Sequence, residues 1–266
     1  MSDWRTLNRK HWDERVPLHV QSAFYDVAGW RAGRDSLQPF EVEEVGDVAG
    51  SSLVHLQCHF GLDTLSWARR GARVTGVDFS GEAVAAARSL AAASGLAARF
   101  VEADVYDAPT ALGTTYDIVY TSHGVLSWLP DLDGWAAVVA ALLRPGGFLY
   151  LSEFHPLSWC LDQGAPTPQL GRDPEHDYFV AEPLAFADPG SYADRGARTA
   201  CDATIEHQHR LGQVVTALCA RGFALDFLRE RDWTLYPQFP WLRREGDRYV
   251  QPGARVPLLY SLRARR

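Results

Sequence analysis

The clearest indication of the fold is the sequence VHLQCHFG at residues 54–61, followed by RVTGVD at residues 73–78. An apolar run stops at a tight turn, a helical stretch follows, and a second apolar run ends on an acid. This order is typical of a βαβ unit that presents a turn, a helix N-terminus and a carboxylate to a ligand. The two segments therefore predict parallel strands with a nucleoside site at their carboxyl ends, where Asp78 can accept hydrogen bonds from a ribose diol.

The turn at residues 57–61 contains Gly61 as its only glycine. A dinucleotide fingerprint needs several glycines so that the backbone can approach a pyrophosphate. Asp63 lies in the first turn of the predicted helix, where its carboxylate would repel a diphosphate and attract an ammonium group. A nucleoside that lacks phosphates and has a positive end suits this arrangement, and S-adenosylmethionine is such a molecule.

Composition limits the class of protein. With 266 residues, 47% of them hydrophobic, the chain is long enough for one compact α/β domain with a few additions. A formal net charge of -7 argues against a nucleic-acid-binding face, which is usually basic. The four cysteines show no CxxC pairing, which indicates reduced thiols, and no stretch approaches the ~18 apolar residues of a membrane span. We therefore expect a cytoplasmic protein whose partner is a small molecule, with neither nucleic acid nor membrane bound.

Strand-like and helical segments alternate between residues 51 and 155. The expected strands are 53–56, 73–77, 98–102, 116–121 and 148–152, and the expected helices are 62–70, 82–93 and 132–143. Such alternation predicts a doubly wound, Rossmann-like parallel sheet. A helix at 209–220 and strands at 223–230 and 257–263 follow, which favours an antiparallel hairpin at the sheet edge.

Two further segments flank this pattern. Residues 1–50 are polar, aromatic and helix-leaning, and they form either a lid over the ligand edge or a plain packing segment. Residues 156–203 contain six prolines, and we interpret this irregular stretch as a lid insertion with a short hairpin between 178–180 and 184–186. The single domain then divides into an N-terminal helical cap (1–50), a cofactor-binding core (51–155), the lid insertion (156–203) and a C-terminal helix and strand pair (204–266).

Ligands of an open parallel sheet lie beyond the carboxyl ends of its strands. Asp78 ends the second strand, and Phe79 follows it at the place of an adenine face. Asp104 follows the third strand and suits the adenine amino group, and Val105 offers a backbone amide to a ring nitrogen. Either aspartate could instead cap the turn or helix that follows it.

The strand–turn–helix unit, Asp78, Asp104, YDIV at 116–119 and LLRPGG at 142–147 together resemble the successive motifs of class I S-adenosylmethionine-dependent methyltransferases. The resemblance covers about residues 50–155, and LQCHFGLDTLSWARRGA with VTGVDFS further resembles a bacterial small-molecule methyltransferase subgroup. It implies S-adenosylmethionine as the cofactor, a seven-stranded sheet with an antiparallel last strand, and methyl transfer to a small molecule. The expected cofactor-binding residues are Gln57, Cys58, Gly61, Asp78, Phe79, Asp104, Val105 and His123.

The turn departs from the family pattern, acid-x-Gly-x-Gly-x-Gly. His55 stands at the acid, and Gln57 and His59 stand at the first two glycines. The side chains of Gln57 and His59 therefore either point away from the cofactor or touch it. This departure keeps open a non-catalytic S-adenosylmethionine-binding regulator, and the similar sheet of nicotinamide-dependent oxidoreductases is a second alternative.

A general base is needed only for some acceptors. Methyl transfer mainly requires alignment of the acceptor and exclusion of water. A hydroxyl, phenol or amine acceptor also profits from a base, for which histidine is suited, whereas a carboxylate acceptor needs none. His123 and His155 follow the fourth and fifth strands, and His209, with His207 nearby, begins the last helix. These histidines are candidate bases, although a hydrogen-bonded structural role is the commoner one for any single histidine.

Several aromatic residues lie outside the regular strands and either shape an acceptor pocket or form small cores under loops. They are Tyr25, Trp128, Trp159, Tyr236, Phe239 and Trp241. In the first case the acceptor is small and partly apolar. No metal site is expected, since paired ligands at a recognised spacing are absent and His207 and His209 would diverge on a helix.

Overall fold

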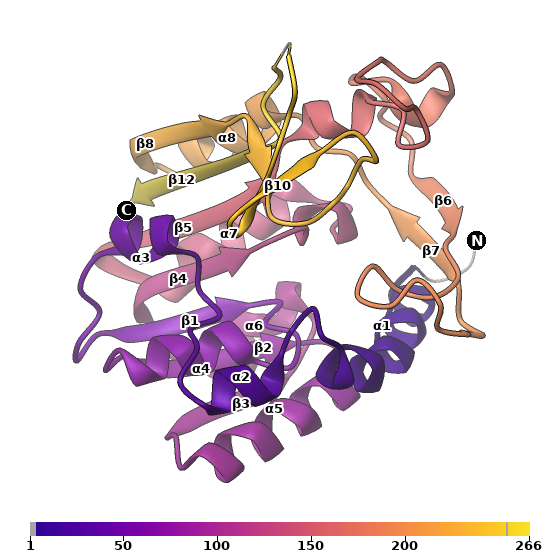
Figure 1. Cartoon of the computed structure of the whole chain (residues 1–266). Coiled ribbons are helices and arrows are strands. Elements are labelled where there is room, and N and C mark those ends of the chain that lie inside the picture. The colour runs from indigo at the N-terminus through magenta and orange to yellow at the C-terminus, as the bar shows by residue number, and fades with distance from the viewer. Residues whose placement is uncertain (1–3, 254) are drawn as a thin grey trace.

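The computed structural model of the chain describes residues 4–253 and 255–266. Its centre is a seven-stranded sheet in the order β3-β2-β1-β4-β5-β12-β8 (Figure 1). The first five strands are parallel, whereas β12 is antiparallel to both β5 and β8. The prediction of a Rossmann-like sheet with an antiparallel last strand is confirmed. The strands are β1 (Ser52–Leu56), β2 (Arg73–Asp78), β3 (Ala98–Glu102), β4 (Tyr116–Ser122), β5 (Leu143–Phe154), β8 (Ala224–Arg231) and β12 (Leu259–Arg265).

Helices cover both faces of the sheet, because side chains of buried strands point alternately to opposite sides. On one face Trp67 lies against Tyr120 of β4, with ring centroids 5.5 Å apart. On the other face Trp135 is fully buried in a cluster with Leu149 of β5. β1 is buried along its whole length beside β4, where the strand order reverses. The helices are α4 (Leu62–Arg69) and α5 (Gly81–Ser94) on the first face, and α6 (Ala108–Leu112), α7 (Leu132–Leu142) and α8 (Leu211–Ala220) on the second.

The N-terminal segment forms α1 (Trp4–Gln21), α2 (Val27–Arg31) and α3 (Pro39–Val45). α3 attaches to the sheet through charged side chains, which is unusual for a buried helix face. Glu41 accepts a hydrogen bond from the Tyr120 hydroxyl at 2.7 Å, and Glu44 accepts one from the Tyr150 hydroxyl at 2.8 Å. Both carboxylates are nearly inaccessible to solvent, so α3 brings buried negative charge to the sheet near its ligand edge.

The expected lid insertion (156–203), called the lid segment from here on, contains two short 3₁₀ helices and one strand. They are η3 (Pro156–Cys160), η4 (Pro174–His176) and β6 (Leu184–Ala187). The expected hairpin between 178–180 and 184–186 is wrong, because β6 pairs antiparallel with β7 (Ala203–Glu206). Residues 177–180 instead form a turn, in which the Asp177 carboxylate accepts from the Phe179 N–H at 2.8 Å. The β6–β7 hairpin contacts α1 on the ligand side of the sheet (Figure 1).

A small three-stranded sheet in the order β10-β11-β9 lies between β8 and β12 in the chain and was not predicted. Its strands are β9 (Trp233–Thr234), β10 (Arg243–Glu245) and β11 (Arg248–Val250). Among the described residues, no helix is both long enough and apolar enough to cross a membrane.

Candidate active site

A cavity of about 900 Å³ lies at the carboxyl ends of β1, β2 and β4, where the strand order reverses. Ligands of doubly wound sheets bind at this place. Residues of α1, of the lid segment and of the C-terminal segment complete its walls. All the expected cofactor-binding residues line it, namely Gln57, Cys58, Gly61, Asp78, Phe79, Asp104, Val105 and His123.

The turn after β1 has the left-handed backbone conformations of a glycine-rich turn, although Gly61 is its only glycine. Gln57 and His59 have φ values of 54° and 50°, and Gly61 has 77°. Left-handed backbone costs a residue with a Cβ about 1–2 kcal/mol. Gln57 Nε2 donates to the Val125 carbonyl at 2.9 Å, which ties the turn to the loop after β4. At Gly61 a Cβ atom would lie 2.6 Å from Phe100, so no other residue fits there.

His59 joins the turn to two other parts of the chain. Its Nε2 and Nδ1 of His19 in α1 share a hydrogen bond of 2.7 Å. His19 Nε2 lies 2.6 Å from the Ser191 hydroxyl in the lid segment. Burial lowers the pKa of His59 well below its usual value and that of His19 to about 3. Both rings are therefore neutral at neutral pH, and the chain couples the turn, α1 and the lid segment by hydrogen bonds.

Asp78 ends β2 with its carboxylate at the cavity wall. Its Oδ2 accepts from the His59 N–H at 2.8 Å, and its Oδ1 accepts from the Ser80 N–H at 2.9 Å. Burial raises the pKa of Asp78 to about 6, although these backbone donors oppose the rise. Each oxygen keeps a further lone pair, so the carboxylate can accept the two hydroxyl groups of a ribose.

Asp104 follows β3 and is shared with α1. Its Oδ1 accepts from the Tyr106 N–H at 2.9 Å, and its Oδ2 accepts from Arg5 Nε at 2.7 Å. Trp4, next to Arg5 on α1, also lines the cavity. α1 therefore covers the end of the cavity at which Phe79 and Asp104 lie.

His123 lines the cavity, and a buried carboxylate lies next to it. Its Nε2 is 3.3 Å from Oε1 of Glu41, which the Tyr120 hydroxyl and the Gln38 N–H also hold in place. Burial disfavours the charged imidazole, but the Glu41 charge outweighs this effect and the pKa of His123 is raised. The Glu41 charge therefore favours the protonated imidazole, which makes His123 less suited to accept a proton.

His155 does not line the cavity, contrary to its expected place at the ligand edge. Its ring points toward β12, where it lies 5.9 Å from the Tyr260 ring. Nδ1 accepts from the Leu157 N–H at 3.1 Å and so begins η3, and Nε2 lies 2.9 Å from Oε1 of Glu230. The side chain is 3% exposed and has a structural position.

His207 and His209 also lie outside the cavity lining. His209 Nε2 donates to the Leu129 carbonyl at 2.6 Å, because the segment before α8 runs along the loop after β4. The backbone N–H of His207 donates to the Ser127 carbonyl at 2.7 Å. Both histidines thus fasten the segment between β7 and α8, and neither is placed to act as a base.

Four of the expected pocket aromatics line the cavity, namely Tyr25, Trp128, Trp159 and Tyr236. Trp241 does not, because its ring stacks on Phe239 at 4.7 Å in a separate small core with Leu161 and Leu258. For Trp241 and Phe239, the alternative of a small core under loops therefore holds.

Glu153 organises the loop after β4 from the neighbouring strand. Its carboxylate accepts from the N–H groups of Gly124, Val125 and Leu126 at 2.5, 2.8 and 3.0 Å, and from that of Phe154 at 2.7 Å. Burial raises its pKa against these donors. The loop that carries His123 and receives the Gln57 side chain is therefore rigidly placed.

The part of the chain that contains these strand ends is similar to known proteins. Residues 54–149 match the family model described as a methyltransferase domain. The chain carries a methyltransferase domain. This domain includes the turn after β1, Asp78, Asp104 and the loop after β4.

Curated relatives of the methyltransferase domain are named ubiquinone biosynthesis O-methyltransferases. The protein from Cronobacter sakazakii is 30% identical over 137 residues, which cover 50% of this chain and 56% of the relative. The protein from Xanthomonas euvesicatoria pv. vesicatoria is 32% identical over 136 residues, with coverage of 50% and 56%. The chain spans about half the length of the curated relatives it matches.

Solved structures resemble a larger part of the chain. An S-adenosylmethionine-dependent methyltransferase from Mesorhizobium loti has a TM-score of 0.60 at 23% identity, and the match covers 86% of this chain and 96% of that one. Magnesium protoporphyrin IX methyltransferase from Synechocystis PCC 6803 with bound SAH has a TM-score of 0.52 at 17% identity, with coverage of 99% and 100%. At these identities the similarity establishes the fold, which is that of class I methyltransferases.

The cavity at the strand ends of the methyltransferase domain is strongly acidic. Its lining includes eight carboxylates and three arginines. Each arginine is already paired with an aspartate, Arg15 with Asp202, Arg34 with Asp26 and Arg195 with Asp188. A positively charged ligand suits such a lining, and a diphosphate does not. The carboxylates are Asp63, Asp78, Asp104, Asp162, Asp173, Glu175, Asp188 and Glu206.

Some lining residues had no role in the sequence-based prediction. Trp12 lies on the cavity face of α1, with its ring 5.2 Å from that of Trp128. Tyr192 and Glu206 enter from the lid segment and β7. The eight-residue spacing of Trp4 and Trp12 on one helix face could have indicated the first, whereas nothing in the local sequence marks Tyr192 or Glu206.

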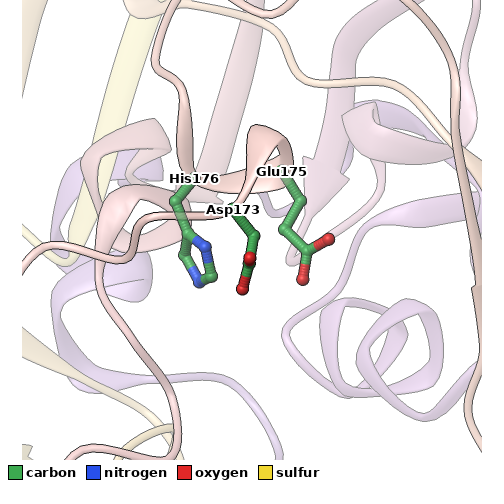
Figure 2. Close-up of side chains that lie close together, drawn as sticks. All are labelled: Asp173, Glu175 and His176. Carbon is green, nitrogen blue, oxygen red and sulfur yellow. The ribbon is translucent and has the colours of Figure 1, made fainter.

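Asp173, Glu175 and His176 form a cluster at the cavity wall (Figure 2). Their side chains project to the same side of η4, and their potential ligand atoms all lie within 4.8 Å of one another. Asp173 and Glu175 are exposed to solvent. Because neighbouring exposed acids are common in proteins that bind no ion, this cluster alone does not define a metal site.

Proposed function

We propose that this protein transfers a methyl group from S-adenosylmethionine to a small, partly apolar molecule. The observation that supports this most is the acidic cavity at the switch point of a methyltransferase domain. S-adenosylmethionine carries a sulfonium and an ammonium group and no phosphate, so its charge complements this lining. When bound, it supplies a methyl group already activated by the positive sulfur.

The residues present fit this cofactor. Asp78 would accept the ribose hydroxyls, and Phe79, Asp104 and Val105 would surround the adenine. The turn at 57–61 would face the methionine part, with Asp63 as the nearest carboxylate on α4. The methyl group would then point into the remaining volume, whose walls include Trp128, Trp159 and Tyr236 among other aromatic side chains.

The protein's own contribution would be alignment and exclusion of water. α1 and the β6–β7 hairpin both line the cavity and contact each other. We propose that the helical cap (1–50) and the lid insertion (156–203) close over the acceptor, whereas the core (51–155) and the C-terminal part (204–266) complete the domain. The same proposal makes a small molecule the partner and places the protein in the cytoplasm, in keeping with four unpaired cysteines.

Isothermal titration calorimetry tests the cofactor. We expect micromolar binding of S-adenosylhomocysteine and no heat with NADH or NADPH. The reverse result would replace the proposal with a nicotinamide-dependent oxidoreductase. Transfer of label from S-adenosylmethionine to a panel of phenols, amines, thiols and carboxylic acids then tests catalysis, and binding without transfer to any of them would favour a non-catalytic regulator.

A further inference from the structure

Glu206 lines the cavity together with aromatic residues that have no role in the proposed cofactor site. We call this part the acceptor end and define it by Phe154, Tyr192, Glu206 and Tyr236, all of which line the cavity. The ring of Tyr236 lies 5.2 Å from that of Phe154 and 6.3 Å from that of Tyr192. The Glu206 charge contributes to the raised pKa of Tyr236, after burial as the main cause. A carboxylate and three aromatic rings therefore line the same cavity.

The backbone around Glu206 is fixed on both sides. The next residue, His207, donates its N–H to the Ser127 carbonyl at 2.7 Å. The preceding residue, Ile205, exchanges two backbone hydrogen bonds with the Asn8 side chain of α1, at 2.8 and 2.9 Å. Because side chains alternate along a strand, Glu206 and Thr204 share the face of β7 that lines the cavity. Glu206 is thus held close to the loop that follows β4.

Few neighbouring groups stabilise the negative charge of the Glu206 carboxylate. Its hydrogen bond within the described part of the chain comes from the Thr204 hydroxyl, at 3.3 Å, and no arginine, lysine or histidine there forms an ion pair with it. By contrast, Asp188 pairs with Arg195, and Asp104 pairs with Arg5. Even a partly buried carboxylate without a cation is unfavourable unless a ligand supplies a donor.

The electrostatic surroundings suit proton transfer near neutral pH. Burial raises the pKa of Glu206 to about 7, the Thr204 hydroxyl opposes the rise and the Asp188 charge adds to it. From the C-terminal segment Tyr236 faces it as a neutral phenol, since burial raises the pKa of Tyr236 to about 12. α1 contributes the neutral Asn8 beside β7, and its Arg15 is occupied by Asp202.

We propose that Glu206 is the general base of the reaction and that the acceptor is an aromatic molecule with a phenolic hydroxyl group. This inference rests on the proposed function. The aromatic walls of the acceptor end suit a planar ring, and the charges of Glu206 and Asp188 disfavour an acceptor that is itself an anion. His123 is less suited as the base, because the Glu41 charge raises its pKa and favours the protonated ring.

Methyl transfer forms one C–O bond and breaks one C–S bond. A lone pair of the phenolic oxygen forms the new C–O bond, the C–S bond of S-adenosylmethionine breaks, and its electron pair returns to sulfur. The phenolic proton moves to a Glu206 carboxylate oxygen, and the products are a methyl ether and S-adenosylhomocysteine. Such a base contributes ~10²–10⁴-fold to the rate.

The test compares Glu206→Gln with Glu182→Gln, which neutralises an exposed carboxylate outside the cavity lining. Methyl transfer is measured with catechol and with 4-nitrocatechol, whose hydroxyl ionises without help. We expect Glu206→Gln to slow transfer to catechol ~10²–10⁴-fold, to slow transfer to 4-nitrocatechol about tenfold or less, and to remove the rise of kcat/KM with pH. Calorimetry should show unchanged S-adenosylhomocysteine binding and weakened catechol binding to the S-adenosylhomocysteine-loaded protein.

Several results would overturn the inference while leaving the proposed function intact. The first is an equal loss of rate with both acceptors, which indicates a structural role of Glu206. The second is full activity of Glu206→Gln. The third is transfer by the wild type to amines, thiols or carboxylic acids and not to phenols. Absence of catechol binding to the loaded protein would also overturn it. If the wild type does not bind S-adenosylhomocysteine at all, the proposed function itself fails.

Discussion

Replacement of Asp63 by asparagine should separate recognition of the methionine part from recognition of the adenosine. His55 stands where the family pattern has an acid, but burial lowers its pKa to about 3 and its Nδ1 shares a hydrogen bond of 2.9 Å with Thr64. A neutral imidazole cannot neutralise an ammonium group. Asp63, in the first turn of α4, lines the cavity near this position, and we expect it to receive the ammonium group instead.

The structure sets the size of the effect. A hydrogen bond between charged groups in a partly buried site contributes about 1.5–3 kcal/mol, so Asp63→Asn should weaken S-adenosylhomocysteine binding ~10- to 150-fold. Burial, with the Glu41 charge as the next cause, raises the pKa of Asp63 to about 6. At pH 7.5 the carboxylate is therefore almost fully ionised, whereas at pH 5.5 only about a quarter of it is. The ratio of wild-type to variant affinity should therefore fall about fourfold between these pH values, whereas titration of Asp78, whose pKa is also about 6, affects both proteins alike.

Calorimetry with two ligands measures this effect. S-adenosylhomocysteine contains the ammonium group, and 5′-methylthioadenosine has the same adenosine and sulfur without it. Asp63→Asn should lose affinity for the first ligand alone, and Glu182→Gln, which changes an exposed carboxylate outside the cavity lining, should bind both like the wild type. Equal losses for both ligands, or no loss for either, would refute the assignment of Asp63. Failure of the wild type to bind either ligand would instead refute the cofactor.

Three further predictions concern the same site. Asp78→Ala should weaken binding of both ligands by about 1.5–3 kcal/mol, because it removes hydrogen bonds to the shared ribose, and unchanged calorimetric affinity in a folded variant would count against this role. In urea denaturation, Gln57→Gly should be about 1 kcal/mol more stable than Gln57→Ala, since φ is 54° and both variants lack the bond to Val125; equal stabilities would contradict strain at this turn. The loss of unfolding free energy caused by His55→Asn should shrink as pH falls, by ~1.4 kcal/mol per unit below pH 6.5. The wild-type ring, with a pKa of about 3, stays neutral in the folded protein while it takes up a proton in the unfolded chain, so the wild-type stability is fully present above pH 6.5 and progressively lost below it. A constant difference between pH 5 and 7.5 would exclude that explanation.

The core of the fold could be predicted because its signals are local. Each parallel strand is a short apolar run followed by a polar turn, so the five strand positions and the order of crossovers follow from residues 51–155. The position of Asp78 at the end of β2 follows from the same pattern. The start of α5 does too, since the Ser80 hydroxyl accepts from the Ala83 N–H at 3.0 Å.

The lid and the acceptor end could not be predicted in the same way. β6 pairs with β7 across an intervening loop of irregular chain, and such a pairing leaves no periodic signal in either short strand. His155 and His209 looked similar to His123 because all three follow or precede regular elements. Their different orientations depend on distant partners, Glu230 for His155 and the Leu129 carbonyl for His209.

The altered turn after β1 shows how side chains can replace glycine at a ligand-facing backbone. Left-handed conformations at residues 57 and 59 are unfavourable by about 1–2 kcal/mol each, and each position offsets this with hydrogen bonds that glycine cannot make. The Gln57 side chain bonds to the Val125 carbonyl, and His59 bonds to His19, which reaches Ser191. A glycine turn would contact the cofactor and nothing else, whereas this turn is joined to the loop after β4, to α1 and to the lid segment. Any movement of α1 or of residues 156–203 would therefore break or stretch hydrogen bonds to this turn, so that the proposed cofactor binding and the proposed closure over the acceptor would be linked by the residues that depart from the family pattern.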